Sequence, residues 1–269
     1  MLKQRLITAL VLAPGVIAII FLLPNPWLQL LLAVILLGGA IELGRLAGLL
    51  QTAALGAYLL LTAALMLALY LHPDWRFSAM VVATALWLPL LLWLSRSGTG
   101  TARHGGWRLL KAAAGMVVIV PAWLALGDLQ RHHPLWLLGL LLVVWAADVG
   151  AYAAGKTLGR HKLAPRISPG KTIEGLLGGL LVAALVGWIY AWLNGYAKGH
   201  DLLIIGLIIP ITLVSVGGDL LISLFKRHAG SKDTGQLLPG HGGLMDRIDS
   251  LCAAAPFYWL AVALWQGWR

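Results

Sequence analysis

The sequence predicts an all-α integral membrane protein with about nine transmembrane helices, and three observations support this. The 269 residues are 60% hydrophobic and only 11% charged, whereas a soluble domain carries about 25% charged residues. The mean hydropathy is +0.86. The chain also contains uncharged apolar runs near the length, roughly 17–25 residues, that crosses the hydrocarbon core as a helix. We therefore expect a single polytopic membrane domain over residues 1–269 and no soluble module.

The expected helices follow from these apolar runs, taken in chain order. The first run is too long for one span, and the sequence LPNP at 23–26 divides it into two. No small-x-small cleavage site follows the N-terminal stretch, which favours a retained first helix over a signal peptide. One further span contains a single acid, Asp148. The uncharged runs are 6–41, 46–73, 77–95, 112–127, 175–197, 202–218 and 250–268, and the span with one acid is 134–155.

The distribution of basic residues predicts the orientation of the chain. With a cytoplasmic N-terminus and nine alternating spans, sixteen of the 20 lysines and arginines lie on the cytoplasmic side, and Arg76, Arg131, Lys198 and Arg269 lie opposite. The positive-inside rule then predicts an N-terminus in the cytoplasm and a C-terminus outside. This topology accounts for the net charge of +10 without a nucleic-acid partner. The single cysteine, Cys252, excludes an intrachain disulfide.

Two polar segments on the expected cytoplasmic side, 148–175 and 219–250, contain acids at the ends of spans. Asp219 ends the eighth span, Asp246 and Asp249 begin the ninth, and Asp148 lies about 10 Å inside the sixth at 1.5 Å per residue. Ionisable groups in spans usually face partners or water-filled cavities. Carboxylates hold Mg²⁺, which shares its ligands with substrate phosphates, and nearby cations neutralise phosphate charge. The residues predict Mg²⁺-dependent transfer at phosphorus, and the absence of a Walker sequence excludes a P-loop enzyme.

The stretch SLFKRHAGSKDTGQLLPGHGGLMDRID at 223–249 resembles the signature of the phosphatidate cytidylyltransferases, also called CDP-diacylglycerol synthases. The matching positions are Ser223, Lys226, Arg227, Lys232, Asp233, Gly235, Pro239, His241, Gly242, Gly243, Asp246, Arg247 and Asp249. The stretch DVGAYAAGKTLGRHKLAPRISPGKTIEG at 148–175 is similar to the second polar segment of that family. The chain departs from the family in GDLLIS, where Ile222 stands at a position that is often acidic.

The resemblance implies that the protein transfers a cytidylyl group from CTP to phosphatidic acid, with release of pyrophosphate. It implies a bacterial inner-membrane enzyme whose site faces the cytoplasm, with membrane lipids as partners and a homodimer left open. The expected metal ligands, for Mg²⁺ with a second cation left open, are Asp219, Asp246 and Asp249. These three and Lys226, Arg227, Lys232, His241 and Arg247 form the expected catalytic set. Substrate binding is expected from Ser223, Asp148, Tyr152, Ser168, Lys171, Thr172, Glu174, Asp233, Gly242 and Gly243.

Other interpretations of the same residues stay open. Asp246 and Arg247 are also compatible with a structural ion pair, and Asp148 with a lysine pair that serves burial alone. Glu42 and Arg45 are interpreted as a local cap or pair. A CTP-dependent polyprenol or lipid kinase uses similar chemistry on another acceptor. An ion-coupled transporter also places acids in spans, but it predicts acids near the midplane and polar groups on both faces.

Overall fold

The computed structural model describes residues 13–96, 107–197, 199–235 and 242–268. Within these ranges, eight helices are long and apolar enough to cross a membrane. They are α2 (Asn25–Leu46), α3 (Thr52–Leu71), α4 (Arg76–Arg96), α5 (Trp107–His132), α6 (Pro134–Thr157), α7 (Ile173–Leu193), α8 (Asp201–His228) and α9 (Met245–Gln266). The all-α membrane fold is confirmed. A shorter apolar helix, Ala13–Leu22, precedes these eight, and the rest of the expected first span lies outside the described residues.

The boundaries of several helices follow from proline and from capping residues. Pro24 precedes α2 and Pro26 lies in its first turn, where the missing N–H of proline needs no helical partner. The side chain of Asn25 donates hydrogen bonds to the carbonyl of Gly127 (2.8 Å) and to the amide oxygen of Gln130 (2.7 Å) on α5. The break predicted at 23–26 is therefore a turn between two helices, and it is anchored to α5.

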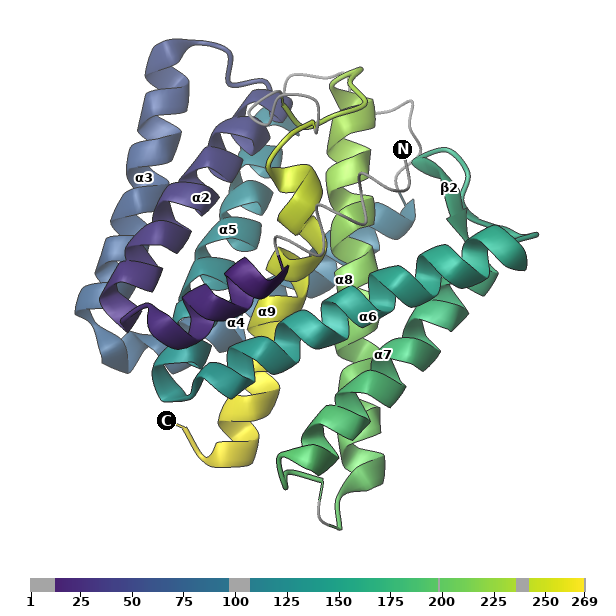
Figure 1. Ribbon diagram of the computed structural model, residues 1–269. Helices are drawn as coiled ribbons and strands as arrows, with labels where there is room; N and C mark the ends of the chain where they lie inside the picture. Colours follow the sequence, from purple (N-terminus) through teal and green to yellow (C-terminus); the bar gives the residue numbers. More distant parts are fainter. Residues whose placement is uncertain (1–12, 97–106, 198, 236–241, 269) are drawn as a thin grey trace.

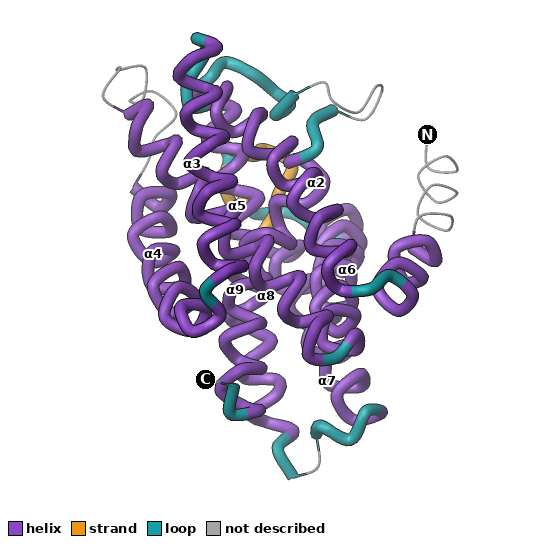
Figure 2. Tube along the Cα trace, turned by 90° about the vertical axis from the view of Figure 1, so that its left-hand side faces the viewer, coloured by secondary structure: helices purple, strands orange, loops and turns teal. Residues whose placement is uncertain are grey.

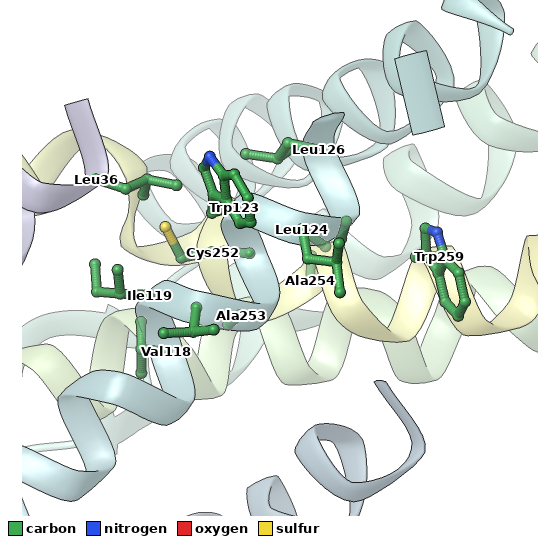
Figure 3. Close-up of a cluster of buried hydrophobic side chains, with 14 of the residues drawn as sticks. Leu36, Val118, Ile119, Trp123, Leu124, Leu126, Cys252, Ala253, Ala254 and Trp259 are labelled. Carbon is green, nitrogen blue, oxygen red and sulfur yellow. The ribbon is translucent and has the colours of Figure 1, made fainter. Parts of the chain in front are cut away.

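The largest apolar core lies between α2, α5 and α9 (Figure 3), where Leu36 and Trp123 pack near Cys252. In α5, 72% of the most apolar window is buried, against 17% in α3 and in α7. The buried alanines 253–255 of α9 let the helix backbones approach closely, which is how helices associate in lipid without a hydrophobic driving force between them. Helix α5 is thus the central helix, whereas α3 and α7 present most of their surface outward (Figure 2).

A buried ion pair joins three helices at the end of the bundle that holds the C-terminus. Asp128 of α5 is 2% exposed. Its Oδ1 lies 3.2 Å from the Arg76 guanidinium, and its Oδ2 accepts a hydrogen bond of 2.9 Å from the Trp259 indole of α9. The topology prediction places Arg76 on the outer side of the membrane, and the structure shows that it is buried at the start of α4.

A short β-hairpin forms in the connection between α6 and α7, which the sequence interpretation treats as an irregular polar segment. Strand β1 (Lys162–Ala164) pairs antiparallel with β2 (Ser168–Thr172). The carboxylate of Glu174 accepts hydrogen bonds from the backbone N–H of Arg160 (3.0 Å) and from the ring of His161 (2.6 Å). The hairpin lies at the ends of α6 and α7, near the end of α8 (Figure 1), so it positions the polar residues of segment 148–175 over one end of the bundle.

Candidate active site

Acids of α6, α8 and α9 form an acidic cluster, which consists of Asp148, Asp219, Asp246 and Asp249. Asp148 and Asp219 lie nine residues before the ends of their helices, so α8 continues beyond the position at which the sequence prediction ends the eighth span. Asp249 of α9 is buried and interacts electrostatically with Asp219 of α8. Asp148 of α6 also interacts with Asp219. The structure therefore brings together carboxylates that lie up to 101 residues apart in the chain. Like charges at this range repel one another, so the cluster needs compensating cations.

Two lysines supply positive charge to this cluster. Lys171 Nζ, from β2, lies 2.5 Å from Asp219 Oδ2, and Lys226 Nζ, from α8, lies 2.6 Å from Asp246 Oδ1. Both lysines also interact with Asp249. Ser223, one turn after Asp219, donates a hydrogen bond of 3.3 Å to Asp219 Oδ1. The Asp246 carboxylate thus pairs with Lys226, and a structural pair of Asp246 with Arg247 stays a prediction.

The second oxygen of Asp246 binds backbone N–H groups of the signature segment. Oδ2 accepts hydrogen bonds from the N–H of Thr234 (2.9 Å) and of Gly243 (3.1 Å). Gly242 has φ +84°, a conformation that favours glycine. A Cβ at this position would lie 3.6 Å from Asp233 Oδ1. Asp246 is therefore held at both oxygens, by Lys226 at Oδ1 and by two backbone N–H groups at Oδ2.

Most of the hairpin residues that were expected to bind substrate instead make hydrogen bonds within the hairpin or to the start of α7. The Thr172 side chain is buried and accepts a hydrogen bond of 3.1 Å from Gly175 N, which caps α7. The Glu174 carboxylate accepts hydrogen bonds from Arg160 and His161, which directly precede β1. Arg227 Nε donates to the carbonyl of Ile167 (3.1 Å), next to Ser168. Of this group, Lys171 is the residue whose side chain reaches the acidic cluster through an ion pair.

Several other predicted residues are exposed or lie outside the described residues. The Tyr152 residue is 57% exposed, and Lys156 Nζ lies 5.7 Å from the centre of its ring. Lys232 and Asp233 are exposed on the connection that follows α8, and Arg247 is exposed on α9. His241 lies outside the described residues. Their assigned roles stay predictions.

The Mg²⁺ site also stays a prediction. Among the described residues, no three histidine, cysteine, aspartate or glutamate side chains are grouped closely enough to hold a metal ion. The donor chemistry nevertheless suits a hard cation, since carboxylate oxygens are the ligands that Mg²⁺ takes in proteins. In this structure, the ammonium group of Lys171 forms an ion pair with Asp219, and that of Lys226 forms one with Asp246. These two lysines supply the positive charge at the carboxylates.

Position 222, where the chain departs from the family pattern, faces the apolar core. Ile222 is 1% exposed and belongs to the main hydrophobic cluster. An acid at this position needs a buried partner or a different packing of α8, because an isolated carboxylate is very unfavourable in apolar surroundings.

Glu42 is the residue whose place in the site the sequence interpretation missed. It belongs to α2, is 1% exposed, and accepts a hydrogen bond of 2.9 Å from the N–H of Met245, 203 residues away. The interpretation of Glu42 as a local cap or pair is therefore wrong. The available signal was an acid directly after an apolar run, since ionisable groups at the ends of spans usually face a partner in the bundle interior.

Comparison with known proteins shows the family of the chain. The family model described as "Cytidylyltransferase family" matches residues 3–265. The chain belongs to the cytidylyltransferase family. It is 44% identical, over 100% of its length and 99% of the relative's, to a phosphatidate cytidylyltransferase of Pseudomonas aeruginosa. It is 36% identical to a phosphatidate cytidylyltransferase of Haemophilus influenzae, over 96% of this chain and 97% of that protein. A Staphylococcus aureus protein of the same name is 43% identical over 45% of this chain and 46% of its own length. The likeness thus includes both polar segments of this family member.

Proposed function

We propose that the protein transfers a cytidylyl group from CTP to phosphatidic acid, giving CDP-diacylglycerol and pyrophosphate. The observation that carries this proposal is the full-length likeness to a phosphatidate cytidylyltransferase at 44% identity. The geometry supports it, because acids and lysines of both polar segments meet at one end of a membrane bundle.

The reaction forms one P–O bond and breaks another. A phosphate oxygen of phosphatidic acid attacks the α-phosphorus of CTP, and the bond from that phosphorus to the pyrophosphate oxygen breaks. Both reactants are anions, so the site must supply positive charge at the reacting phosphates. Lys171 and Lys226 are suited to this task, since each reaches the acidic cluster on a flexible side chain and can exchange a carboxylate partner for a phosphate.

The acids of the cluster are suited to hold Mg²⁺. A Mg²⁺ ion held by these carboxylates would supply positive charge next to the substrate phosphates. Asp219, Asp246 and Asp249 are the residues that we propose as its ligands, and a second cation remains open. Asp246 contributes a fixed position as well, because its Oδ2 is held by two backbone N–H groups.

The proposed location is the bacterial inner membrane, with the site at the cytoplasmic headgroup level. The positive-inside distribution of lysine and arginine supports this orientation. In it, the phosphate of a lipid substrate reaches the acidic cluster while the acyl chains stay in the bilayer. A homodimer remains a prediction.

Two other functions make different predictions for the same site. A CTP-dependent lipid kinase transfers the γ-phosphate of CTP and needs similar carboxylates and cations, so geometry alone does not separate it from a cytidylyltransferase. An ion-coupled transporter predicts acids near the midplane. Asp246 and Asp249 lie in the first turns of α9, whereas Asp148 and Asp219 lie nine residues before the ends of α6 and α8, so an assay of turnover separates transport from transfer.

Labelled CTP separates these functions directly. The full chain in detergent micelles receives phosphatidic acid and Mg²⁺ with CTP that is labelled at either the α- or the γ-phosphate. We expect α-label in the lipid product and γ-label in released pyrophosphate. Transfer of γ-label to lipid indicates a kinase, and absence of any labelled lipid refutes transfer from CTP to phosphatidic acid by either route.

Two matched variants on the same helix test the site. Asp219→Asn removes an acid of the cluster, whereas Asp201→Asn changes an acid at the opposite end of α8, where Asp201 accepts a hydrogen bond from the Trp188 indole. We expect a large loss of turnover for Asp219→Asn and little change for Asp201→Asn. Equal effects of the two variants would contradict the placement of the site.

A further inference from the structure

A carboxylate from α2 is inserted among the backbone N–H groups of the signature segment. Glu42 is buried, and its Oε1 accepts a hydrogen bond of 2.9 Å from the N–H of Leu244. Its Oε2 accepts one of 2.9 Å from the N–H of Met245 and one of 2.7 Å from the hydroxyl of Thr234. Three donors from a segment about 200 residues away thus satisfy one buried side chain.

These contacts cap the N-terminus of α9 from another helix. The first N–H groups of a helix have no partner within it and need an outside acceptor. Leu244 occupies the N-cap position of α9, and its hydrocarbon side chain cannot accept a hydrogen bond. Glu42 supplies that acceptor at Leu244 and Met245. The positive end of the helix dipole in turn stabilises the carboxylate charge, which explains how an acid is accommodated in the interior of a membrane protein.

Two glycines of the signature segment are required by the position of this carboxylate. A Cβ added to Gly235 would lie 2.8 Å from Glu42 Cδ, and one added to Gly243 would lie 2.7 Å from Glu42 Oε2. Real Cβ atoms do not approach other atoms this closely, so a larger residue at either position displaces Glu42 or the segment. The segment is therefore built around the Glu42 side chain.

Thr234 connects Glu42 to the acidic cluster. Its hydroxyl oxygen lies 2.7 Å from Glu42 Oε2 and 3.1 Å from Asp246 Oδ2. A hydroxyl has one proton to donate, and the shorter distance assigns it to Glu42. The backbone N–H of the same residue donates to Asp246 Oδ2. Thr234 therefore donates one hydrogen bond to Glu42 and another to Asp246. Through Thr234, Glu42 restricts the position of the Asp246 carboxylate.

We propose that Glu42 is a positioning residue, which caps α9 from α2 and thereby sets the place of Asp246 and Asp249 for chemistry at the substrate phosphates. The proposal rests on the proposed function for its effect on turnover, but the cap itself does not depend on it. Loss of an outer residue that orients metal ligands typically lowers metal affinity or activity about 10–100-fold. We expect a loss in that range on removal of Glu42.

The first test compares Glu42→Gln with Asp128→Asn. Glutamine has one acceptor oxygen, so its NH₂ group must face at least one of the donors of Leu244, Met245 or Thr234. Asp128 is the matched control, because it is also buried and also bonds α9, through Trp259 near the opposite end of that helix. Each variant removes one buried negative charge that accepts a hydrogen bond from α9 or its N-cap residue.

Hydrogen exchange measured by mass spectrometry shows how well the backbone N–H groups at the start of α9 are protected. This measurement depends neither on activity nor on a bound metal. We expect Glu42→Gln to speed exchange in the peptide that covers 242–250 and to leave 255–266 near wild type. Asp128→Asn is expected to show the reverse pattern. Unchanged exchange in 242–250 for Glu42→Gln overturns the cap.

Enzyme kinetics then test whether Glu42 positions the acids of the cluster for catalysis. For Glu42→Gln we expect turnover at saturating Mg²⁺ to fall about tenfold or more, and the Mg²⁺ concentration for half-maximal rate to rise several-fold. Asp128→Asn is expected to lower thermal stability with both kinetic values near wild type. If Asp128→Asn shifts the Mg²⁺ response as Glu42→Gln does, the effect is general destabilisation and the positioning role is wrong.

Changes on the partner side keep the proposal testable should Glu42→Gln fail to fold. Thr234→Val removes the hydroxyl that Glu42 accepts from, whereas Thr234→Ser keeps it. We expect Thr234→Val and Gly235→Ala to raise the Mg²⁺ requirement and Thr234→Ser to stay near wild type. Wild-type values in both Thr234→Val and Gly235→Ala overturn the positioning role. If the unmodified chain makes no CDP-diacylglycerol, the proposed function fails, and hydrogen exchange still decides the cap.

Discussion

Replacement of Asp246 by asparagine tests the most constrained acid of the site. Asp246 Oδ1 pairs with Lys226 Nζ at 2.6 Å, and Oδ2 accepts from the N–H of Thr234 and of Gly243. Asparagine has one oxygen and one NH₂ group. In one orientation the NH₂ group faces the Lys226 ammonium, and in the other it faces two N–H donors. Neither orientation satisfies the site, so Asp246→Asn is disruptive despite its similar shape.

The magnitude follows from burial. The side chains of Lys226 and Asp246 are each 13% exposed. Removal of one partner of a buried ion pair costs about 3–5 kcal/mol, and the residual exposure of this pair favours the lower end, about 3 kcal/mol. Lys226→Met leaves Asp246 with its two backbone donors, so we expect a smaller loss of about 2 kcal/mol. The two losses are not additive, since residues in direct contact couple by about 0.5–3 kcal/mol.

A double-mutant cycle measures this coupling. Unfolding of the wild type, both single variants and the double variant in micelles gives the free energies, and turnover of CTP with phosphatidic acid is measured on the folded fraction. We expect Asp246→Asn to lose at least about 100-fold in turnover, because asparagine would hold neither Mg²⁺ nor Lys226 as a carboxylate does, and loss of such a source of positive charge at the phosphates typically costs about 10²–10³-fold. Additive losses of stability, or near wild-type turnover of Asp246→Asn, would refute the reasoning.

Three further substitutions address other parts of the structure. Thr172→Ala removes the N-cap of α7, and we expect thermal unfolding to show a loss of about 1 kcal/mol, with Thr172→Ser near wild type. Arg76→Ala leaves Asp128 buried without its main partner, so a loss of about 3–5 kcal/mol is expected, with turnover per folded molecule unchanged; a change in turnover would contradict the distance of this pair from the site. Ile222→Glu buries an unpartnered carboxylate, so we expect poor folding and no gain in rate, and a faster, stable enzyme would show that position 222 lies closer to the cluster than its burial indicates.

Membrane insertion and the approximate spans could be predicted from the sequence because the lipid environment strongly limits which structures can form. Every backbone polar group in the hydrocarbon core must be satisfied internally, and a long apolar run can achieve this only as a helix. The break at 23–26 was readable for the same local reason, since prolines interrupt a helical hydrogen-bond ladder. Asp246 and Asp249, three residues apart and so on one face of a helix, were recognisable from the sequence as a pair of carboxylates.

The contacts of the site were not readable in this way. The hairpin at 162–172 contains a strand of only three residues, too short to show a period. Thr172 reads equally well as a phosphate ligand or as a cap, and the choice depends on where α7 begins. Lys171 and Lys226 are both cations near acids in sequence, and only the packing assigns Lys171 to Asp219 and Lys226 to Asp246.

The sequence by itself determined that the chain is a helical membrane protein of the cytidylyltransferase type, with its acids gathered toward one face. Composition and local spacing contain that information because lipid solvation and helix geometry act on neighbouring residues. Only the tertiary structure decided that Glu42 caps α9 and that Asp246 is held by Thr234 and Gly243. Those hydrogen bonds join segments up to 203 residues apart, and they form because buried donors and acceptors must find partners wherever helix packing places them.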